Sequence, residues 1–118
     1  MKLIACLSCF VFLFLCTACT KKQDTPVEQM SSEQLVTRGQ SIYKLNCIAC
    51  HNIDPTKDGV TGPALAGSNL ELLTARLLRA EYPAGYKAKR SSNGMPAMKH
   101  LEKEIPALEA YLKSVAPL

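Results

Sequence analysis

Apolar residues recur at helical spacing in the segment before residue 47. The positions that share one face, at i, i+4, i+7 and i+8, are Leu35, Gly39, Ile42 and Tyr43. A serine at position 31 or 32 offers a side chain that can cap the start of a helix. We therefore predict a helix that begins near Ser32 and leads directly into Cys47.

Two further segments show the same periodicity. The apolar positions of the first are Leu70, Leu73 and Leu77, and those of the second are Leu101, Ile105, Leu108, Leu112 and Val115. Ser68 or Asn69 can cap the first of these helices. Pro106 is compatible with the second only in its first turn, so that helix should begin near Lys103. No segment shows a convincing strand alternation, and the predicted fold class is all-α.

A short cysteine motif follows the first predicted helix. Its sequence is Cys47-Ile48-Ala49-Cys50-His51, a C-x-x-C-H pentapeptide. This spacing is typical of covalent c-type haem attachment. The two thiols add across the two vinyl groups of one porphyrin, and the adjacent histidine is then close enough to ligate the iron. The sequence predicts one covalent haem c, attached through Cys47 and Cys50 and ligated by His51.

The same motif has two other interpretations. A thioredoxin-like redox pair belongs in a βαβ context, which the helical pattern does not offer. A zinc site needs a second pair of ligands, and His100 is the one Cys or His residue that follows His51 in the sequence. Both interpretations fit the chain less well than haem attachment.

The N-terminal segment has the pattern of an export signal. Lys2 gives a positive start, and residues 3–15 are apolar apart from one serine. This stretch suits a signal peptide over residues 1–18 better than a membrane span. Residues 15–19 (Leu-Cys-Thr-Ala-Cys) resemble a bacterial lipoprotein signal, although Cys16 stands where that pattern prefers an aliphatic residue. We expect Cys19 to be lipidated, with ordinary cleavage before it or an uncleaved anchor as alternatives.

Polar residues separate this leader from the predicted domain. Residues 19–31 show no apolar periodicity and are interpreted as a polar tether. The domain then covers residues 32–118, a size at which a bound cofactor often supplies part of the core. The formal net charge of the chain is only +4, so we expect no nucleic-acid partner. We expect the protein to be exported to the periplasm and to be anchored to a bacterial membrane by the lipid on Cys19.

The motifs follow one another in a defined order. Gly39 and Tyr43 of the first helix precede the C-x-x-C-H motif, and Tyr111 lies in the last helix. Two further segments lie between the C-x-x-C-H motif and the last helix: residues 61–65 (Thr-Gly-Pro-Ala-Leu) and residues 93–97 (Asn-Gly-Met-Pro-Ala). In this order the chain resembles a monohaem class I cytochrome c of the small bacterial type. The two segments correspond to the T-G-P-x-L loop and the Met-Pro ligand loop of that family.

The resemblance implies a small cytochrome c fold with the covalent haem as part of its core. The N- and C-terminal helices cross in this fold, which makes Gly39 against Tyr111 the expected contact. The proline loop also supplies a backbone carbonyl to the ligating histidine. Pro63 would therefore fix the tautomer and orientation of His51.

The sixth iron ligand decides the type of function. Met95 is the predicted ligand, because the ligand of the family precedes proline and follows a glycine-containing turn. Met98 is the rival, and either methionine has filling of the core as its alternative role. His100 is interpreted as a solvated surface residue or a group at the start of a helix, rather than as an iron ligand. Histidine opposite methionine gives a closed six-coordinate iron that carries one electron.

The predicted function is electron transfer between redox proteins, without an enzymatic reaction. One alternative is a haem enzyme or gas sensor with a displaceable sixth ligand, and another is a haem subunit of a larger oxidoreductase complex. Basic side chains flank the predicted ligand loop and the haem motif, namely Lys57, Lys87, Lys89, Arg90 and Lys99. They have two interpretations: a solvated loop, or a basic rim that steers an acidic partner or a membrane complex.

Overall fold

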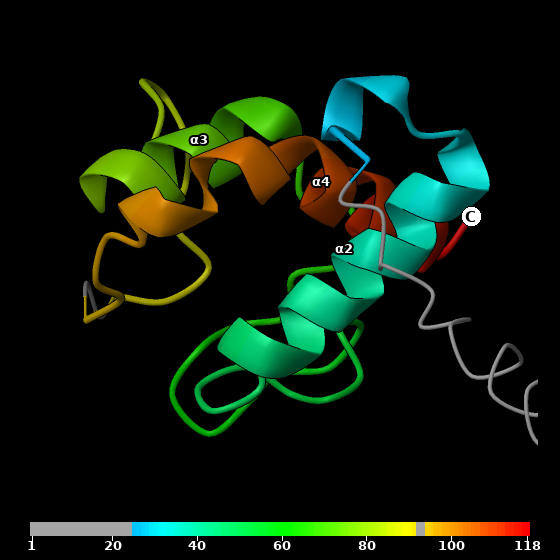
Figure 1. The fold of residues 1–118 in the computed structure, drawn as a ribbon. Helices are drawn as coiled ribbons and strands as arrows, with labels where there is room; N and C mark the ends of the chain where they lie inside the picture. Colours follow the sequence, from blue (N-terminus) through cyan, green and yellow to red (C-terminus); the bar gives the residue numbers. More distant parts are fainter. Residues whose placement is uncertain (1–24, 92–93) are drawn as a thin grey trace, which may run out of the picture.

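The computed structural model describes residues 25–91 and 94–118, and these residues form helices and loops without a strand. The elements in chain order are η2 (Val27–Gln29), α2 (Ser32–Asn46), α3 (Leu70–Arg79), η3 (Lys99–Glu104) and α4 (Ile105–Ser114). The all-α prediction is confirmed. Figure 1 shows α3 and α4 side by side, and α2 crossing α4 at a steep angle.

Helix α2 begins with a capping box. The Ser31 hydroxyl accepts from the Gln34 backbone N–H at 3.3 Å, and the Ser31 N–H donates to the Gln34 side chain at 2.8 Å. Both bonds satisfy N–H groups that lack a partner within a helix or turn. The prediction of a helix from Ser32 into the cysteine motif is confirmed, with Ser31 as the cap.

Helix α3 is capped twice at its start. The Asn69 side chain accepts from the Leu72 N–H at 2.9 Å, and the Glu109 carboxylate of α4 accepts from the Leu70 N–H at 2.8 Å. The helix ends at Ala80, which takes the left-handed conformation with φ of 57°. The cap at Asn69 follows the sequence pattern, whereas the contribution of Glu109 depends on tertiary packing.

Helix α4 begins two residues later than the predicted start near Lys103. The turn before it, Lys99–Glu104, is a 3-10 helix, and the α-helical hydrogen bonds begin only at Ile105. Pro106 lies in the first turn, where its missing N–H costs no helical hydrogen bond. The periodicity correctly predicted the buried positions Leu101, Ile105 and Leu108, but it did not distinguish the two helix types.

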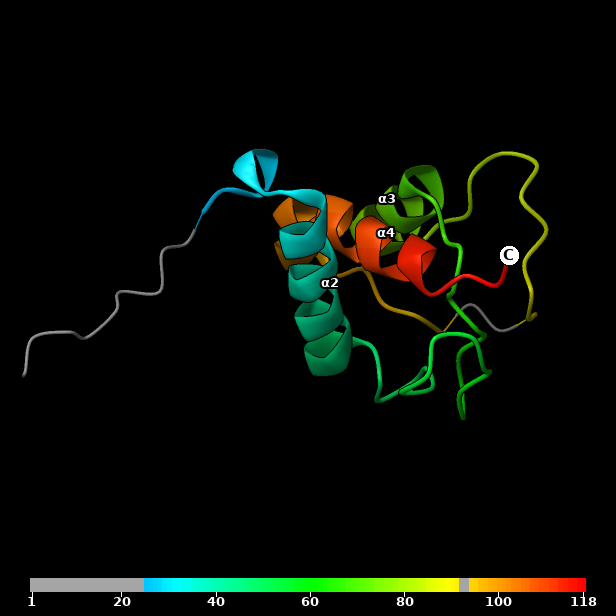
Figure 2. The ribbon, with the colours of Figure 1, turned by 90° about the vertical axis from the view of Figure 1, so that its right-hand side faces the viewer.

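The centre of the fold is the crossing of α2 and α4, which Figure 2 shows from a second direction. Gly39 is the contact point, because a Cβ there would overlap the Ala107 carbonyl and lie 2.8 Å from the Tyr111 Cβ. The Tyr43 and Tyr111 rings pack beside this point with their centroids 5.6 Å apart. The predicted contact of Gly39 with Tyr111 is confirmed. This crossing fixes the direction of α2, and the cysteine motif follows directly at the C-terminal end of that helix.

The segment before α2 contributes one buried side chain to the described structure. Val27, in η2, is buried, although residues 19–31 were interpreted as a polar tether. Within the described residues, buried side chains therefore begin before Ser32. The predicted signal peptide and Cys19 lie outside the described residues. Among the described helices, none is long and apolar enough to span a membrane.

Candidate haem site

A cavity of about 580 Å³ lies between the C-terminal end of α2, helix α3 and the loops after them. Its wall is mainly apolar and includes Leu65, Leu73, Leu77, Leu108 and Leu112. Cys47, Cys50, His51, Pro63, Met95 and Met98 also line it. The predicted site residues that the structure describes are thus brought together around one cavity of a size suited to an organic cofactor.

The cysteine motif is folded into a tight turn at the end of α2. The Cys47 N–H still donates to the Tyr43 carbonyl, and the Cys47 carbonyl accepts from the N–H groups of Cys50 at 3.2 Å and His51 at 2.9 Å. This turn brings both sulfurs and the imidazole to the same cavity. Cys47 is buried and Cys50 is exposed, so the Cys50 side of the attachment lies nearer to solvent. Burial raises the pKa of the Cys47 thiol to about 11.

His51 is oriented by the proline loop. Its Nδ1 lies 2.7 Å from the Pro63 carbonyl oxygen. Because a carbonyl only accepts, Nδ1 carries a proton and donates it in this contact. This is the contact that the resemblance to cytochrome c implies, and it leaves Nε2 as the nitrogen suited to a metal.

Two glycines allow the proline loop to approach the histidine. A Cβ on Gly62 would overlap the His51 ring, 2.5 Å from Nδ1 and 2.8 Å from Nε2. A Cβ on Gly59 would overlap the backbone of Cys50 and His51. The Cys50 carbonyl accepts from the Gly62 N–H at 2.9 Å and the Thr61 N–H at 3.2 Å. The loop is therefore packed and hydrogen-bonded against the haem motif.

Asp58 fixes the far end of the same loop. Its carboxylate accepts from the Ala64 N–H at 2.7 Å and pairs with the Arg90 guanidinium at 3.3 Å. These contacts, the hydrogen bond from Ala64 first, lower the pKa of Asp58 below its usual range. The carboxylate thus holds the backbone that follows Pro63 close to Asp58 and to Arg90.

Tyr43 holds the backbone that follows the histidine. Its side chain is fully buried, lines the cavity, and donates from its hydroxyl to the Asn52 carbonyl at 2.5 Å. Burial is the main cause that raises the pKa of Tyr43 to about 12. The phenol therefore remains a hydrogen-bond donor at neutral pH and keeps Asn52, next to His51, in place.

Both candidate methionines reach the cavity. Met95 and Met98 are partly buried and pack against the core. The Met98 N–H donates to the Leu77 carbonyl of α3 at 2.6 Å, which fixes that residue at the start of η3. Met95 lies in the loop before it, between Gly94 and Pro96. His100 is exposed, in agreement with its interpretation as a surface residue.

The predicted basic rim is partly compensated by nearby oxygens. Lys57 pairs with Asp54 at 3.5 Å and Arg90 with Asp58 at 3.3 Å. Lys89 donates to the Ala64 carbonyl at 2.8 Å. Lys87 and Lys99 are exposed. The rim is therefore a mixed surface rather than a uniformly positive one.

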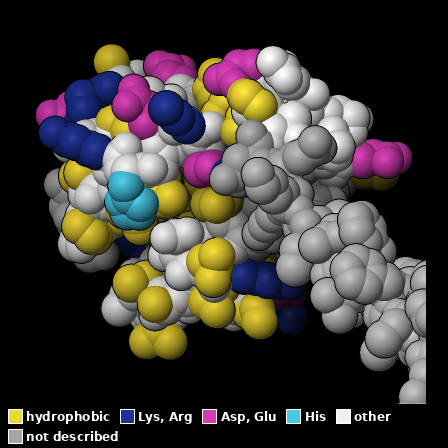
Figure 3. All heavy atoms as spheres, viewed as in Figure 1, with side chains coloured by type: hydrophobic (Ala, Val, Ile, Leu, Met, Phe, Trp, Pro, Cys, Tyr) yellow, Lys and Arg dark blue, Asp and Glu magenta, His cyan; other side chains and the backbone are white. Residues whose placement is uncertain are grey.

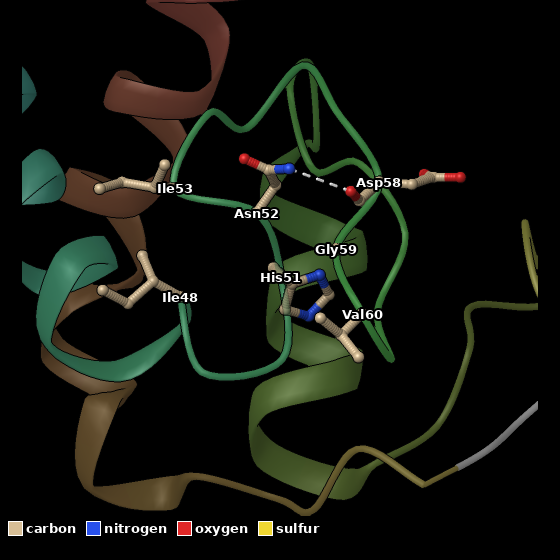
Figure 4. A pocket seen from close by; sticks show the side chains of 7 residues that line it. All are labelled: Ile48, His51, Asn52, Ile53, Asp58, Gly59 and Val60. Carbon is tan, nitrogen blue, oxygen red and sulfur yellow. Dashed lines mark hydrogen bonds between the residues drawn. The ribbon is translucent and has the colours of Figure 1, made fainter.

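A second, open hollow of about 480 Å³ lies on the outer side of the haem motif (Figure 4). Asn52 and Asp58 bridge it through a side-chain to backbone hydrogen bond of 3.1 Å. Ile48 and Ile53 point away from the His51 ring, on the same side of the loop. Figure 3 shows apolar side chains gathered on this end of the molecule. Its exposed large members, which we call the attachment patch, are Leu45, Ile48, Ile53 and Val60.

Sequence reasoning missed two residues of the site. Asp58 belongs to no recognisable motif. It stabilises the loop through contacts with Ala64 and Arg90 that exist only in the folded protein. Arg76 was not singled out, although a basic residue among the leucines of the second periodic segment is a visible signal. It is buried and lines the cavity.

Comparison with known proteins shows to which family the chain belongs. The search of curated proteins and the search of solved structures each return no match. A family model described as Cytochrome c matches residues 36–116, which include the cysteine motif, the proline loop, Met95 and the last helix. The chain therefore belongs to the cytochrome c family.

Proposed function

We propose that this protein is a single-electron carrier with His51 and Met95 as the axial ligands. Its family membership makes it a haem-binding protein with one covalent c-type haem, and electron transfer with redox protein partners is the general function of that family. We also propose that it acts without catalysing a reaction of its own, and that it is exported and tethered to a bacterial membrane.

The observation that carries the proposal is the hydrogen bond between His51 and Pro63. By donating from Nδ1 to the Pro63 carbonyl at 2.7 Å, the imidazole offers Nε2 in a fixed orientation. Gly62 and Gly59 keep the loop close enough for this bond. When bound there, the haem supplies an iron that gains and loses one electron. A ligand held rigidly in both oxidation states keeps the reorganisation that accompanies each transfer small.

The position of Met95 in the wall of the same cavity as His51 supports the proposal of methionine ligation. The thioether of Met95 is a soft ligand that favours the ferrous state and raises the reduction potential. The apolar leucines of the wall exclude water and disfavour the additional positive charge of ferric iron. A closed, dry, six-coordinate site suits electron transfer and leaves no place for a substrate.

The decisive experiment compares two variants of the purified holoprotein. Met95→Ala should abolish the weak red charge-transfer band of iron-bound thioether and allow carbon monoxide to bind the ferrous form. Met98→Ala is the matched control, because it removes a partly buried methionine of the same cavity, and it should keep the band. The reverse pattern would make Met98 the ligand. A band that persists in both variants, or rapid carbon monoxide binding by the wild type, would contradict the proposal.

The attachment patch supports a docking role in electron transfer. Its residues Ile48, Ile53 and Val60 are exposed by 39%, 67% and 93%, beside the exposed Cys50. We propose that a redox protein with an apolar centre and an acidic margin docks there. Because Lys57 and Arg90 already pair with aspartates, the salt dependence should be modest.

Docking can be tested with a redox partner protein identified from the same cell. Ile53→Ser should lower the second-order rate of electron transfer with that partner and leave the potential unchanged. Leu70→Ser is the control, because it removes an exposed apolar side chain that lies outside the attachment patch. Equal rates for Ile53→Ser and the wild type would remove the patch from the proposal.

A further inference from the structure

Two basic side chains join the segment before the candidate methionines to the proline loop. The Arg90 guanidinium pairs with the Asp58 carboxylate at 3.3 Å and donates to the Gly59 carbonyl at 3.2 Å. The Lys89 ammonium donates to the Ala64 carbonyl at 2.8 Å. These contacts connect residues that are at least 25 positions apart in the chain. The attachment cysteines and the iron ligands give them no role, so they need a separate explanation.

Asp58 is bonded to both segments at once. Its carboxylate accepts from the Ala64 N–H at 2.7 Å in addition to its contact with Arg90. Ala64 follows Pro63, whose carbonyl oxygen lies 2.7 Å from Nδ1 of His51. Figure 4 shows the Asp58 side chain pointing away from the His51 ring, on the outer side of the loop. The backbone that orients the histidine is therefore connected to Arg90 through one carboxylate.

Met95 lies between two anchored positions of the chain. Arg90 precedes it by five residues, which can span at most about 18 Å. Met98 follows it by three residues, and the Met98 N–H donates to the Leu77 carbonyl of α3 at 2.6 Å. A segment that is held at closely spaced points loses less entropy when a residue within it is fixed. Loss of the Arg90 anchor would therefore give Met95 more freedom to move away from the cavity.

We propose that Asp58 and Arg90 are positioning residues that hold the segment with Met95 against the proline loop and thereby slow the release of the sixth ligand from the iron. An exposed ion pair alone contributes little, and 64% of the Asp58 side chain is exposed. Here each partner also bonds to the backbone of the proline loop. Because the pair is accessible to solvent, salt should weaken it. The inference rests on the proposed ligation by Met95.

The test measures how fast imidazole replaces the sixth ligand in the ferric holoprotein. At high imidazole concentration the rate reaches a limit that is set by release of the protein ligand. This limiting rate should rise roughly two- to fivefold in Asp58→Asn and in Arg90→Gln, the range for one exposed ion pair. The carboxamide of Asp58→Asn can still accept from the Ala64 N–H, so that variant removes mainly the ionic contact. The double variant should show no further rise, because both changes remove the same interaction.

Salt and a matched control separate this contact from a general effect of charge. Imidazole is neutral near pH 8, so added sodium chloride should raise the limiting rate of the wild type by weakening the pair, and should leave Asp58→Asn unchanged. Lys57→Gln is the control, because Lys57 pairs at 3.5 Å with Asp54 of its own loop. It should keep the wild-type rate. Equal rises in Lys57→Gln and Arg90→Gln, or additive rises in the double variant, would overturn the proposal.

Hydrogen exchange gives a second readout that does not depend on the iron ligand. In the ferrous holoprotein, Arg90→Gln should speed exchange of the Ala64 N–H, because Asp58 is then held less firmly in the position from which it accepts. Lys57→Gln should not change this rate. Unchanged Ala64 exchange in Arg90→Gln would overturn the proposal. Failure of the Met95 assignment would instead appear in the charge-transfer band and leave the exchange result interpretable.

Discussion

Gly39 of α2 lies directly against Tyr111 of α4, with no room for a side chain between the two helices. A Cβ built on Gly39 would be 2.8 Å from the Tyr111 Cβ and in overlap with the Ala107 carbonyl. Real Cβ atoms essentially never approach other heavy atoms so closely. The obstacle at Ala107 is backbone, which cannot move aside without shifting α4. The closeness of this crossing therefore depends on the absence of one methyl group.

Substitution of Gly39 should destabilise the holoprotein. Intrinsic helix propensity alone predicts that Gly39→Ala stabilises by roughly 1 kcal/mol. We expect the opposite, a loss of about 1–3 kcal/mol for Ala and a larger loss for Val, because overpacking forces the helices apart. Thermal or denaturant unfolding monitored at the Soret band measures the change. Gln40→Ala, at the exposed neighbouring position, is the control, and an unchanged or raised stability of Gly39→Val would contradict the close crossing.

The elements that the sequence predicted correctly are those determined by interactions between residues that are close together in the chain. The caps at Ser31 and Asn69 accept from N–H groups three residues away, and the C-x-x-C-H turn forms within five consecutive residues. Pro106 restricts the start of α4 through its own ring. Each of these features is specified by neighbouring residues, so the pattern alone is sufficient to predict it.

The features that the sequence did not predict depend on contacts between distant segments. Glu109 caps the start of α3 from α4, and Asp58 reaches Arg90 across the site. The position of Arg76 at the cavity follows from how α3 packs, and its place among the leucines of that helix was the one sign of it in the sequence. The choice between Met95 and Met98 stays a prediction, because both side chains reach the same cavity.

A methyl group at Gly62 should disturb the iron ligand. The Cβ of Gly62→Ala would overlap the His51 ring, so either the ring or the loop with Pro63 must move. We expect a mixture of coordination states in the visible spectrum and a potential that differs from the wild type. Thr61→Ala is the control from the same loop, because it removes only a 3.3 Å hydroxyl contact to the Cys50 carbonyl. If both variants kept the wild-type spectrum, the loop would not be what orients His51.

The ion pair between Arg38 and Glu104 should make stability depend on pH in the acid range. The guanidinium donates to both carboxylate oxygens, at 2.7 and 2.5 Å, and joins α2 to the start of α4. The hydrogen bonds from Arg38 lower the pKa of Glu104. A lowered folded-state pKa gives stability that is present above the unfolded value of about 4.3 and is lost as pH falls through the folded value.

Glu104→Gln should therefore cost about 1 kcal/mol at pH 7 and progressively less below about pH 4. The difference in unfolding free energy between variant and wild type, measured from pH 7 to pH 3, isolates this contribution from other acid-sensitive groups. Glu81→Gln is the control, because its pair with Arg79 is exposed on both sides. A difference that stays constant across this pH range would show that the ionised pair does not stabilise the fold.

The proposed lipid anchor depends on Cys19. Two or more acyl chains on this residue provide stable attachment, whereas a single chain binds a membrane only reversibly. Cys19→Ser should release a soluble, still red and still six-coordinate cytochrome into the periplasmic or culture fraction, and mass spectrometry of the wild type should find the acyl chains. Retention of the variant in membranes after high-salt washing would instead indicate an uncleaved leader or a tightly bound partner. A wild-type protein already soluble, with an unmodified N-terminus at Cys19 or Thr20, would exclude the anchor and leave a freely diffusing carrier.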